Sequence, residues 1–134
     1  MLHRLNIPSD PSRINEVADF LESRALALGL KESAVADLVI AGSEAVNNAI
    51  LHGNQQRTDQ SVEIILRKEG EHFLVLEVED EGHSFSLDSL PDPTSSEHLM
   101  DEGGRGWLII RHLMDDVEVL QSDRGTRVVM KKRR

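Results

Sequence analysis

Near its middle the chain carries Ser43-Glu44-Ala45-Val46-Asn47-Asn48-Ala49-Ile50-Leu51-His52-Gly53-Asn54, a segment that combines an apolar helical pattern with a line of polar side chains. Glu44, Asn48 and His52 are spaced by four residues, so on a helix they lie along one stripe. A carboxamide oxygen is a hard, neutral ligand that suits Mg²⁺, and a carboxylate can orient or deprotonate a hydroxyl nucleophile. The segment therefore predicts either a helix that carries chemistry or, with equal weight, an ordinary helix with a solvated polar face.

Two helices are predicted in this half of the chain. The helix that contains the segment is expected over residues 32–51, with Gly53 at the place of a C-terminal cap. An earlier helix is expected to begin at Asp10 and Pro11, because a carboxylate N-cap followed by proline favours helix initiation. Gly29 can end that helix in a left-handed conformation. Apolar residues recur at helical spacing in both segments, so each helix is expected to pack one face against a core.

Strands are expected on both sides of these helices, followed by a short third helix over residues 107–114. The predicted strands cover residues 1–7, 61–68, 72–79, 117–120 and 127–132. Residues 81–105 lack periodicity, and a loop of this length is usually a functional lid or a disordered segment. The order of elements predicts an α/β (α+β) two-layer sandwich, in which one mixed, mostly antiparallel sheet has its helices on one face.

A second candidate site signal is Val78-Glu79-Asp80-Glu81-Gly82, at the end of a predicted strand. Because side chains alternate along a strand, Asp80 falls on the same side as the apolar residues before it. A carboxylate accepts hydrogen bonds, so it can select a ring with an exocyclic amine such as adenine, and Gly82 leaves room for that ring. The alternative is an ordinary turn that ends a strand.

The third signal is the glycine cluster Gly103-Gly104-Arg105-Gly106, directly before the apolar start of a predicted helix. Backbone N–H groups in such a loop can bind phosphate, and the helix N-terminus adds a partial positive charge. The alternative is a flexible hinge.

Composition limits the classes of protein that fit. The chain has 134 residues, of which 39% are hydrophobic, enough for one core, so residues 1–134 are expected to form a single domain. A net charge of -9 argues against nucleic acid as a direct partner. The absence of cysteine excludes disulfides and thiolate chemistry. We expect a cytoplasmic protein without a membrane segment, since no signal peptide or apolar run of about 20 residues stands out.

In this order, and with Gly125-Thr126 in the last hairpin, the three signals resemble the GHKL ATPase superfamily, which includes gyrase and the histidine kinases. The closest resemblance is to the anti-sigma factor serine kinases, and it covers nearly the whole chain. It implies ATP and Mg²⁺ as cofactors. It also implies roles for individual residues: Glu44 as catalytic base, Asn48 as Mg²⁺ ligand, Asp80 and Gly82 at adenine, Gly104 and Gly106 at phosphate, Thr126 as a hydroxyl that supports the adenine end through water, and Arg105 within reach of phosphate.

The same resemblance implies partners. In this family a serine kinase phosphorylates a STAS-domain antagonist and holds a sigma factor or another regulator, and phosphorylation switches the partners. A homodimer is also implied. The chain departs from the pattern at Ser84, where the family usually has a second glycine, and residues 88–102 lack a clear Lys or Arg for the terminal phosphate. Two alternatives therefore stay open: a nucleotide-binding module that sequesters a partner without phosphoryl transfer, and a detached histidine-kinase catalytic domain.

Overall fold

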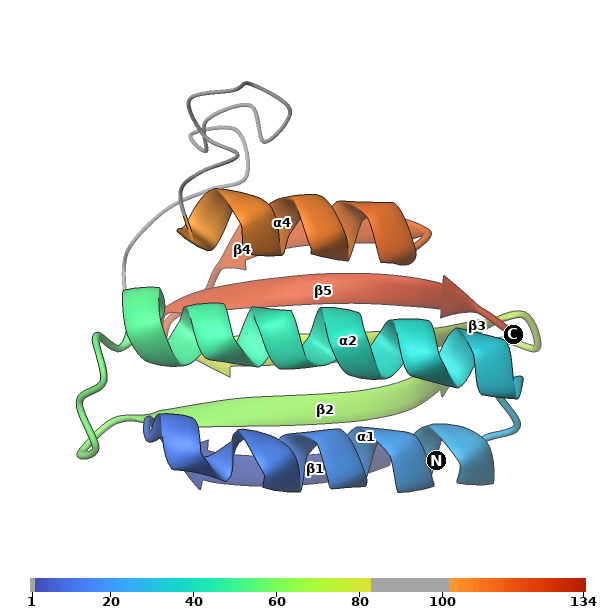
Figure 1. Ribbon diagram of the computed structural model, residues 1–134, viewed down its shortest axis with the longest axis horizontal. Coiled ribbons are helices and arrows are strands. Elements are labelled where there is room, and N and C mark those ends of the chain that lie inside the picture. Colours follow the sequence, from blue (N-terminus) through green and yellow to red (C-terminus); the bar gives the residue numbers. More distant parts are fainter. Residues whose placement is uncertain (1, 83–101) are drawn as a thin grey trace.

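The sheet has five strands in the order β1-β2-β3-β5-β4, and helices α1, α2 and α4 lie on one of its faces (Figure 1). This architecture comes from a computed structural model, which describes residues 2–82 and 102–134 and, of residues 102–105, the backbone only. The strands are β1 (Leu2–Pro8), β2 (Ser61–Glu69), β3 (Phe73–Asp80), β4 (Asp116–Gln121) and β5 (Thr126–Arg133). The helices are α1 (Ile14–Ala27), α2 (Glu32–Asn48) and α4 (Glu102–Leu113), with a 3₁₀ turn η1 (Pro11–Arg13) before α1 and a π-helical turn η2 (Ala49–Gly53) after α2.

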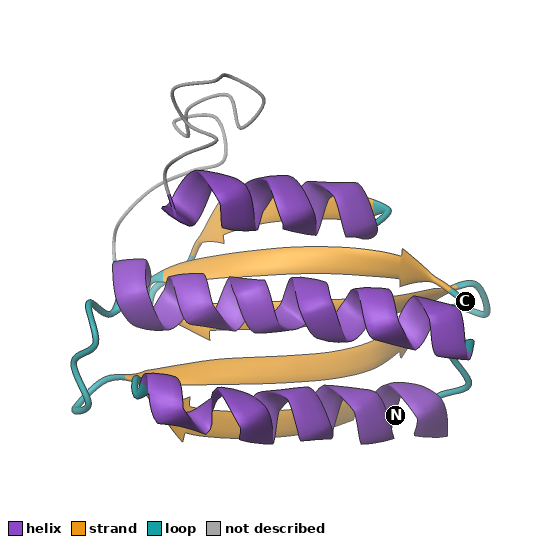
Figure 2. Cartoon of the chain, in the orientation of Figure 1, coloured by secondary structure: helices purple, strands orange, loops and turns teal. Residues whose placement is uncertain are grey.

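The predicted two-layer sandwich is confirmed, with one refinement. Among the described strands every neighbouring pair is antiparallel, so in this part of the chain the sheet is not mixed. The helices form a single layer over it, which Figure 2 shows as purple ribbons in front of orange strands. Both hairpins connect strands that are adjacent in the sheet.

The start of the helical layer follows from local chemistry. The Asp10 carboxylate accepts a hydrogen bond of 3.0 Å from the Ser12 N–H and so caps η1, which leads directly into α1. That bond lowers the pKa of the Asp10 carboxyl below its ordinary value. Gly29 has a φ of 87°, the left-handed conformation expected after α1.

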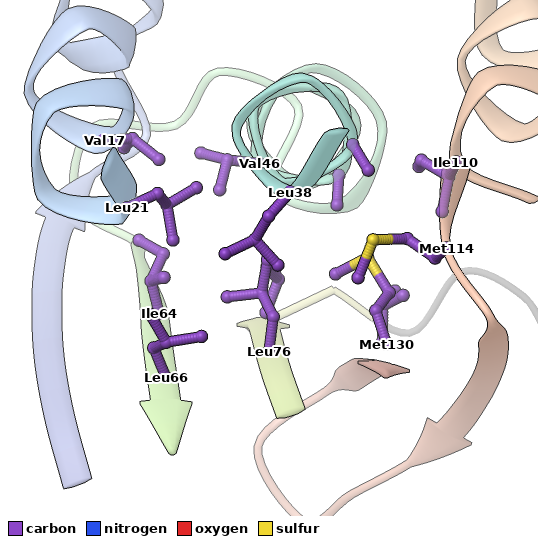
Figure 3. Packing of buried hydrophobic residues seen from close by; sticks show 14 of the residues in the cluster. Val17, Leu21, Leu38, Val46, Ile64, Leu66, Leu76, Ile110, Met114 and Met130 are labelled. Carbon is purple, nitrogen blue, oxygen red and sulfur yellow. The ribbon is translucent and has the colours of Figure 1, made fainter. Parts of the chain in front are cut away.

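The core lies between the helices and the sheet. Figure 3 shows side chains from α1, α2 and α4 pointing toward side chains of β2, β3 and β5. Helix α2 lies in the middle and contacts both other helices. The fully buried residues of this layer include Leu21, Leu38, Val46, Ile64, Leu66, Leu76, Ile110 and Met130.

Two expectations about helices need correction. The third helix begins at Glu102, five residues before the predicted start, so the glycine cluster lies within α4 and not in a loop before it. The expectation that no apolar run could span a membrane is also wrong by length and composition, because Glu32–Gly53 has a hydropathy of 1.3. Half of the apolar 18-residue stretch within this segment is buried inside the fold, because α2 packs between two helices and over the sheet. A helix that is apolar on several sides is typical of such a position.

Candidate functional site

Four chain segments meet at one edge of the molecule. The C-terminal end of α2, the N-terminal end of α4, the end of β3 and the start of β5 all lie at the left edge of Figure 1. The described residues of all three sequence signals lie at this edge or are adjacent to it in the chain. The topology therefore brings together segments that are far apart in the sequence.

Glu44 and Asn48 lie one turn apart on α2, and both side chains converge on the backbone of Gly106 in α4. A methyl group built on Gly106 would lie 3.1 Å from Asn48 Nδ2 and 3.1 Å from Glu44 Oε2. At this distance a methyl group fits only if Glu44 or Asn48 moves by a few tenths of an ångström, so α4 packs closely on α2 at Gly106. The arrangement places the Glu44 carboxylate and the Asn48 carboxamide side by side, next to the backbone of Gly106, which carries no side chain.

The Asn48 side chain has an unsatisfied amide. The residue is 7% exposed, and its Nδ2 is buried without a hydrogen-bond partner among the described residues. A buried polar group without a partner costs about 1–3 kcal/mol, which a bound ligand can recover. The two ends of the amide exchange by rotation about the last side-chain torsion, so either the oxygen or the nitrogen can face a ligand. Asn48 therefore fits as a ligand-binding group.

The structure removes His52 from the stripe that the sequence predicts. After Asn48 the chain enters the wider π-helical turn η2, so a spacing of four residues no longer returns a side chain to the same face. Asn48 is buried, whereas His52 is exposed. The stripe on the helix consists of Glu44 and Asn48 alone.

Asp80 is a buried carboxylate enclosed by glycines. It is 5% exposed, and its Oδ1 accepts a hydrogen bond of 2.8 Å from the Gly82 N–H. A methyl group on Gly53 would overlap the Asp80 carboxylate, one on Gly82 would overlap the Gly53 carbonyl oxygen, and one on Gly125 would overlap the Asp80 carbonyl oxygen. Gly53 is thus required by its contact with the carboxylate, and Gly82 and Gly125 are required by close approach to backbone beside it.

Sequence reasoning assigned Gly53 a different role. It was expected to cap a helix, but it does not take a left-handed conformation and ends η2 against Asp80. A glycine after a helix gives no signal that separates a cap from a close contact.

Thr126 lies directly beside Asp80. The two residues are cross-strand partners of β3 and β5, and the buried Thr126 hydroxyl donates a hydrogen bond of 3.3 Å to the Gly82 carbonyl oxygen. The predicted adenine-end residues Asp80, Gly82 and Thr126 are therefore brought together. Sequence reasoning did not single out Asn54, which is fully buried and accepts a hydrogen bond from the Glu81 N–H beside this group.

The remaining predicted residues are placed only in part. Gly104 and Arg105 belong to the start of α4, where backbone N–H groups lack acceptors within the helix, and the Arg105 side chain is outside the described residues. Ser84 and nearly all of the expected lid, residues 88–101, are outside them as well.

The metal-binding groups at this edge suit a metal ion that is bound jointly by the protein and a nucleotide. In the described part of the chain there is no group of three His, Asp or Glu residues that could hold a metal ion together. Asn48 supplies one neutral oxygen, and Mg²⁺ is usually held by one or two protein groups together with water and phosphate oxygens. The site fits Mg²⁺ in that form.

Comparisons with known proteins show the family to which the chain belongs. The profile of a family described as "Histidine kinase-like ATPase domain" matches residues 7–132. The serine-protein kinase RsbW of Bacillus pumilus is 32% identical, covering 98% of this chain and 85% of that protein. The serine-protein kinase RsbW of Bacillus subtilis is 33% identical, covering 96% and 82% respectively.

Solved structures with the same fold are more distant in sequence. The RsbU and RsbW domains of a Mycobacterium tuberculosis protein match with a TM-score of 0.70 at 19% identity, covering 99% of this chain. This chain spans 32% of that longer one. A histidine kinase domain from Erythrobacter litoralis matches with a TM-score of 0.60 at 19% identity, covering 94% of this chain and 61% of its own. At these identities the likeness shows the fold alone.

Proposed function

The chain belongs to the histidine kinase-like ATPase family and is related to the RsbW serine-protein kinases, and from that premise we propose that it is an ATP-dependent protein-serine kinase that works by partner switching. The observation that carries the proposal is the convergence of Glu44 and Asn48 on the backbone of Gly106. This arrangement supplies a proton acceptor and a metal ligand at the same point of the fold.

The adenine end of ATP is assigned to Asp80. The Asp80 carboxylate is proposed to accept a hydrogen bond from the adenine exocyclic amine, which guanine lacks at that position. Gly53 packs directly on the carboxylate, Gly82 and Gly125 pack on the backbone beside it, and the Thr126 hydroxyl donates a hydrogen bond to the Gly82 carbonyl oxygen. The phosphates are assigned to the N-terminal turn of α4, which contains Gly104 and Arg105 and whose first backbone N–H groups lack acceptors within the helix.

The transfer step is assigned to Glu44. A serine hydroxyl oxygen of the partner forms a bond to the γ-phosphorus, the bond from that phosphorus to the bridging oxygen breaks, and ADP leaves. The hydroxyl proton passes to the Glu44 carboxylate, to which no described residue donates a hydrogen bond. Mg²⁺, held by Asn48, would offset the charge of the phosphates.

The partners are proposed from the relatives. The phosphorylated serine would lie on a STAS-domain antagonist, and the second partner would be a sigma factor or another regulator. The protein would act in the cytoplasm as a homodimer. With a net charge of -9, direct binding to nucleic acid is not proposed.

Labelled phosphate separates the candidate functions. The purified protein is incubated with γ-labelled Mg-ATP and a STAS-domain protein of the same organism, and the label is assigned by acid and base stability. The proposal expects an acid-stable phosphoserine. Label on a histidine, which is lost in acid, would indicate a detached histidine-kinase domain. ATP binding without any transfer would indicate a module that only sequesters its partner.

A further inference from the structure

Asn54 is the central residue of a buried polar cluster next to the proposed ATP site. The residue has no exposed surface, and its side chain contacts three separate segments. Its Nδ2 donates to Ser9 Oγ at 2.7 Å and to the Ser61 carbonyl oxygen at 3.0 Å, and its Oδ1 accepts from the Glu81 N–H at 2.8 Å. Both amide hydrogens and the amide oxygen are therefore used.

The hydrogen bond between Asn54 and Glu81 lies next to the contact of Gly53 with Asp80 and Gly82. Asn54 directly follows Gly53, which packs against both the Asp80 carboxylate and the backbone of Gly82. Glu81 lies between Asp80 and Gly82. The hydrogen bond between Asn54 and Glu81 therefore links the Gly53 side of this contact to the Asp80–Gly82 side. It does so through the residue next to Gly53 and the residue next to Asp80.

The backbone around Asn54 is held in an uncommon shape. Gln55 and Gln56 have φ values of 53° and 58°, a left-handed backbone conformation that residues other than glycine rarely adopt. Such residues persist where the surroundings over-determine them, and this happens most often near functional sites. Here the surroundings are the anchored Asn54 and a hydrogen bond of 2.7 Å from the Gln56 N–H to the Ile50 carbonyl oxygen.

We infer that Asn54 is a positioning residue for adenine recognition: it fixes the Asp80–Gly82 turn through Glu81 and so sets where the Asp80 carboxylate meets the base. This inference rests on the proposed ATP site but does not depend on the transfer step. The hydrogen bonds of the Asn54 side chain go to Ser9, Ser61 and Glu81, and none of them involves Glu44 or Asn48. Its effect is therefore expected on the affinity and selectivity for the base, and not on the rate of transfer at saturating ATP.

The test compares Asn54→Ala with Ser9→Ala. The second variant is the matched control, because it removes a fully buried hydroxyl of the same cluster and leaves the bond from Asn54 to Glu81 intact. Urea unfolding gives the stability of each protein, and calorimetry gives its affinity for Mg-ATP and Mg-GTP. Asn54→Ser, which keeps a polar group but is too short to bridge all three segments, is measured as well in case the alanine variant does not fold.

Both Asn54 variants are expected to bind ATP about tenfold more weakly than wild type, and the ratio of ATP to GTP affinity should fall by a similar factor. Ser9→Ala should lose stability but keep both affinities within about twofold of wild type. In the transfer assay the KM for ATP should rise in the Asn54 variants while kcat changes little.

Three results would overturn the inference. Folded Asn54 variants with wild-type affinity and selectivity would show that Asn54 only supports the fold. An equal loss of selectivity in Ser9→Ala would assign the effect to stability of the whole cluster. If the wild-type protein binds neither nucleotide, the proposed function fails together with the inference, whereas in the first two cases the function stands.

Discussion

Replacing Gly106 with alanine should separate the stability of the fold from its function. Alanine is favoured over glycine in a helix interior by about 0.8–1.0 kcal/mol. Against this gain, the new methyl group would lie 3.1 Å from Glu44 Oε2 and 3.1 Å from Asn48 Nδ2, a few tenths of an ångström closer than usual. The Glu44 carboxylate is half-buried at the end of a flexible side chain and can move away, whereas Asn48 is buried. The two effects nearly cancel, so the free energy of unfolding should stay within about 1 kcal/mol of wild type.

The same methyl group should impair function, because it fills the space between the proposed base and the proposed metal ligand. We expect the affinity for Mg-ATP to fall about tenfold, which corresponds to about 1.4 kcal/mol, and phosphate transfer to fall further. Urea unfolding, calorimetry and the transfer assay measure the three quantities. Arg111→Ala, on the exposed last turn of the same helix, is the control and should bind ATP as wild type does. If Gly106→Ala is as stable as wild type and binds and transfers equally well, ligands do not occupy the space between Glu44 and Asn48.

Three further variants or probes test other parts of the account. Asp80→Asn keeps an acceptor for the Gly82 N–H but replaces the other oxygen with a donor, so calorimetry should show ATP binding weakened by about 1.5–3 kcal/mol, or tenfold and more; equal affinity would remove Asp80 from the adenine site. Trp107, which follows Gly106 and is 5% exposed, should change its fluorescence when Mg-ATP binds, and an unchanged spectrum at proven saturation would argue against phosphate at the start of α4. Gly42→Ala would bring a methyl group to 2.5 Å from Leu21 and 2.9 Å from Leu76, which are both fully buried, so overpacking of about 1–3 kcal/mol should exceed the helix gain; urea unfolding should show a net loss of stability with ATP affinity unchanged.

The fold was predictable from local signals that the tertiary structure reinforces. Asp10 and Gly29 mark the ends of the first helical segment, and each behaves as its chemistry predicts. The hairpin between β2 and β3 follows from alternation and from its polar turn. The resemblance to the GHKL superfamily depended on three signals in order, of which the spacing of Glu44 and Asn48 is only the first.

The details near the site were less predictable, because tertiary contacts determine them. The π-helical turn after Asn48 displaces His52, and nothing in the alternation of apolar residues indicates this extra width. The start of α4 contains three glycines, residues with poor intrinsic helix propensity, so propensity alone placed its beginning too late. Asn54 is polar and lies in a polar segment, and its burial follows only from the meeting of three distant segments.

The central claim is that Glu44 accepts the proton of the attacking serine while Asn48 holds the metal. Glu44→Gln tests it most directly, because no described residue donates a hydrogen bond to this carboxylate and glutamine has nearly the same shape. Asn48→Ala is the companion variant and should lose Mg²⁺-dependent ATP binding and transfer together.

The decisive measurement is the rate of phosphate transfer from saturating Mg-ATP to the serine of the partner in Glu44→Gln. We predict that this variant still binds ATP and the partner, while its rate of phosphate transfer falls by about 10²–10⁴-fold, the usual contribution of a positioned general base. Transfer at the wild-type rate by a Glu44→Gln protein that binds ATP normally would contradict it.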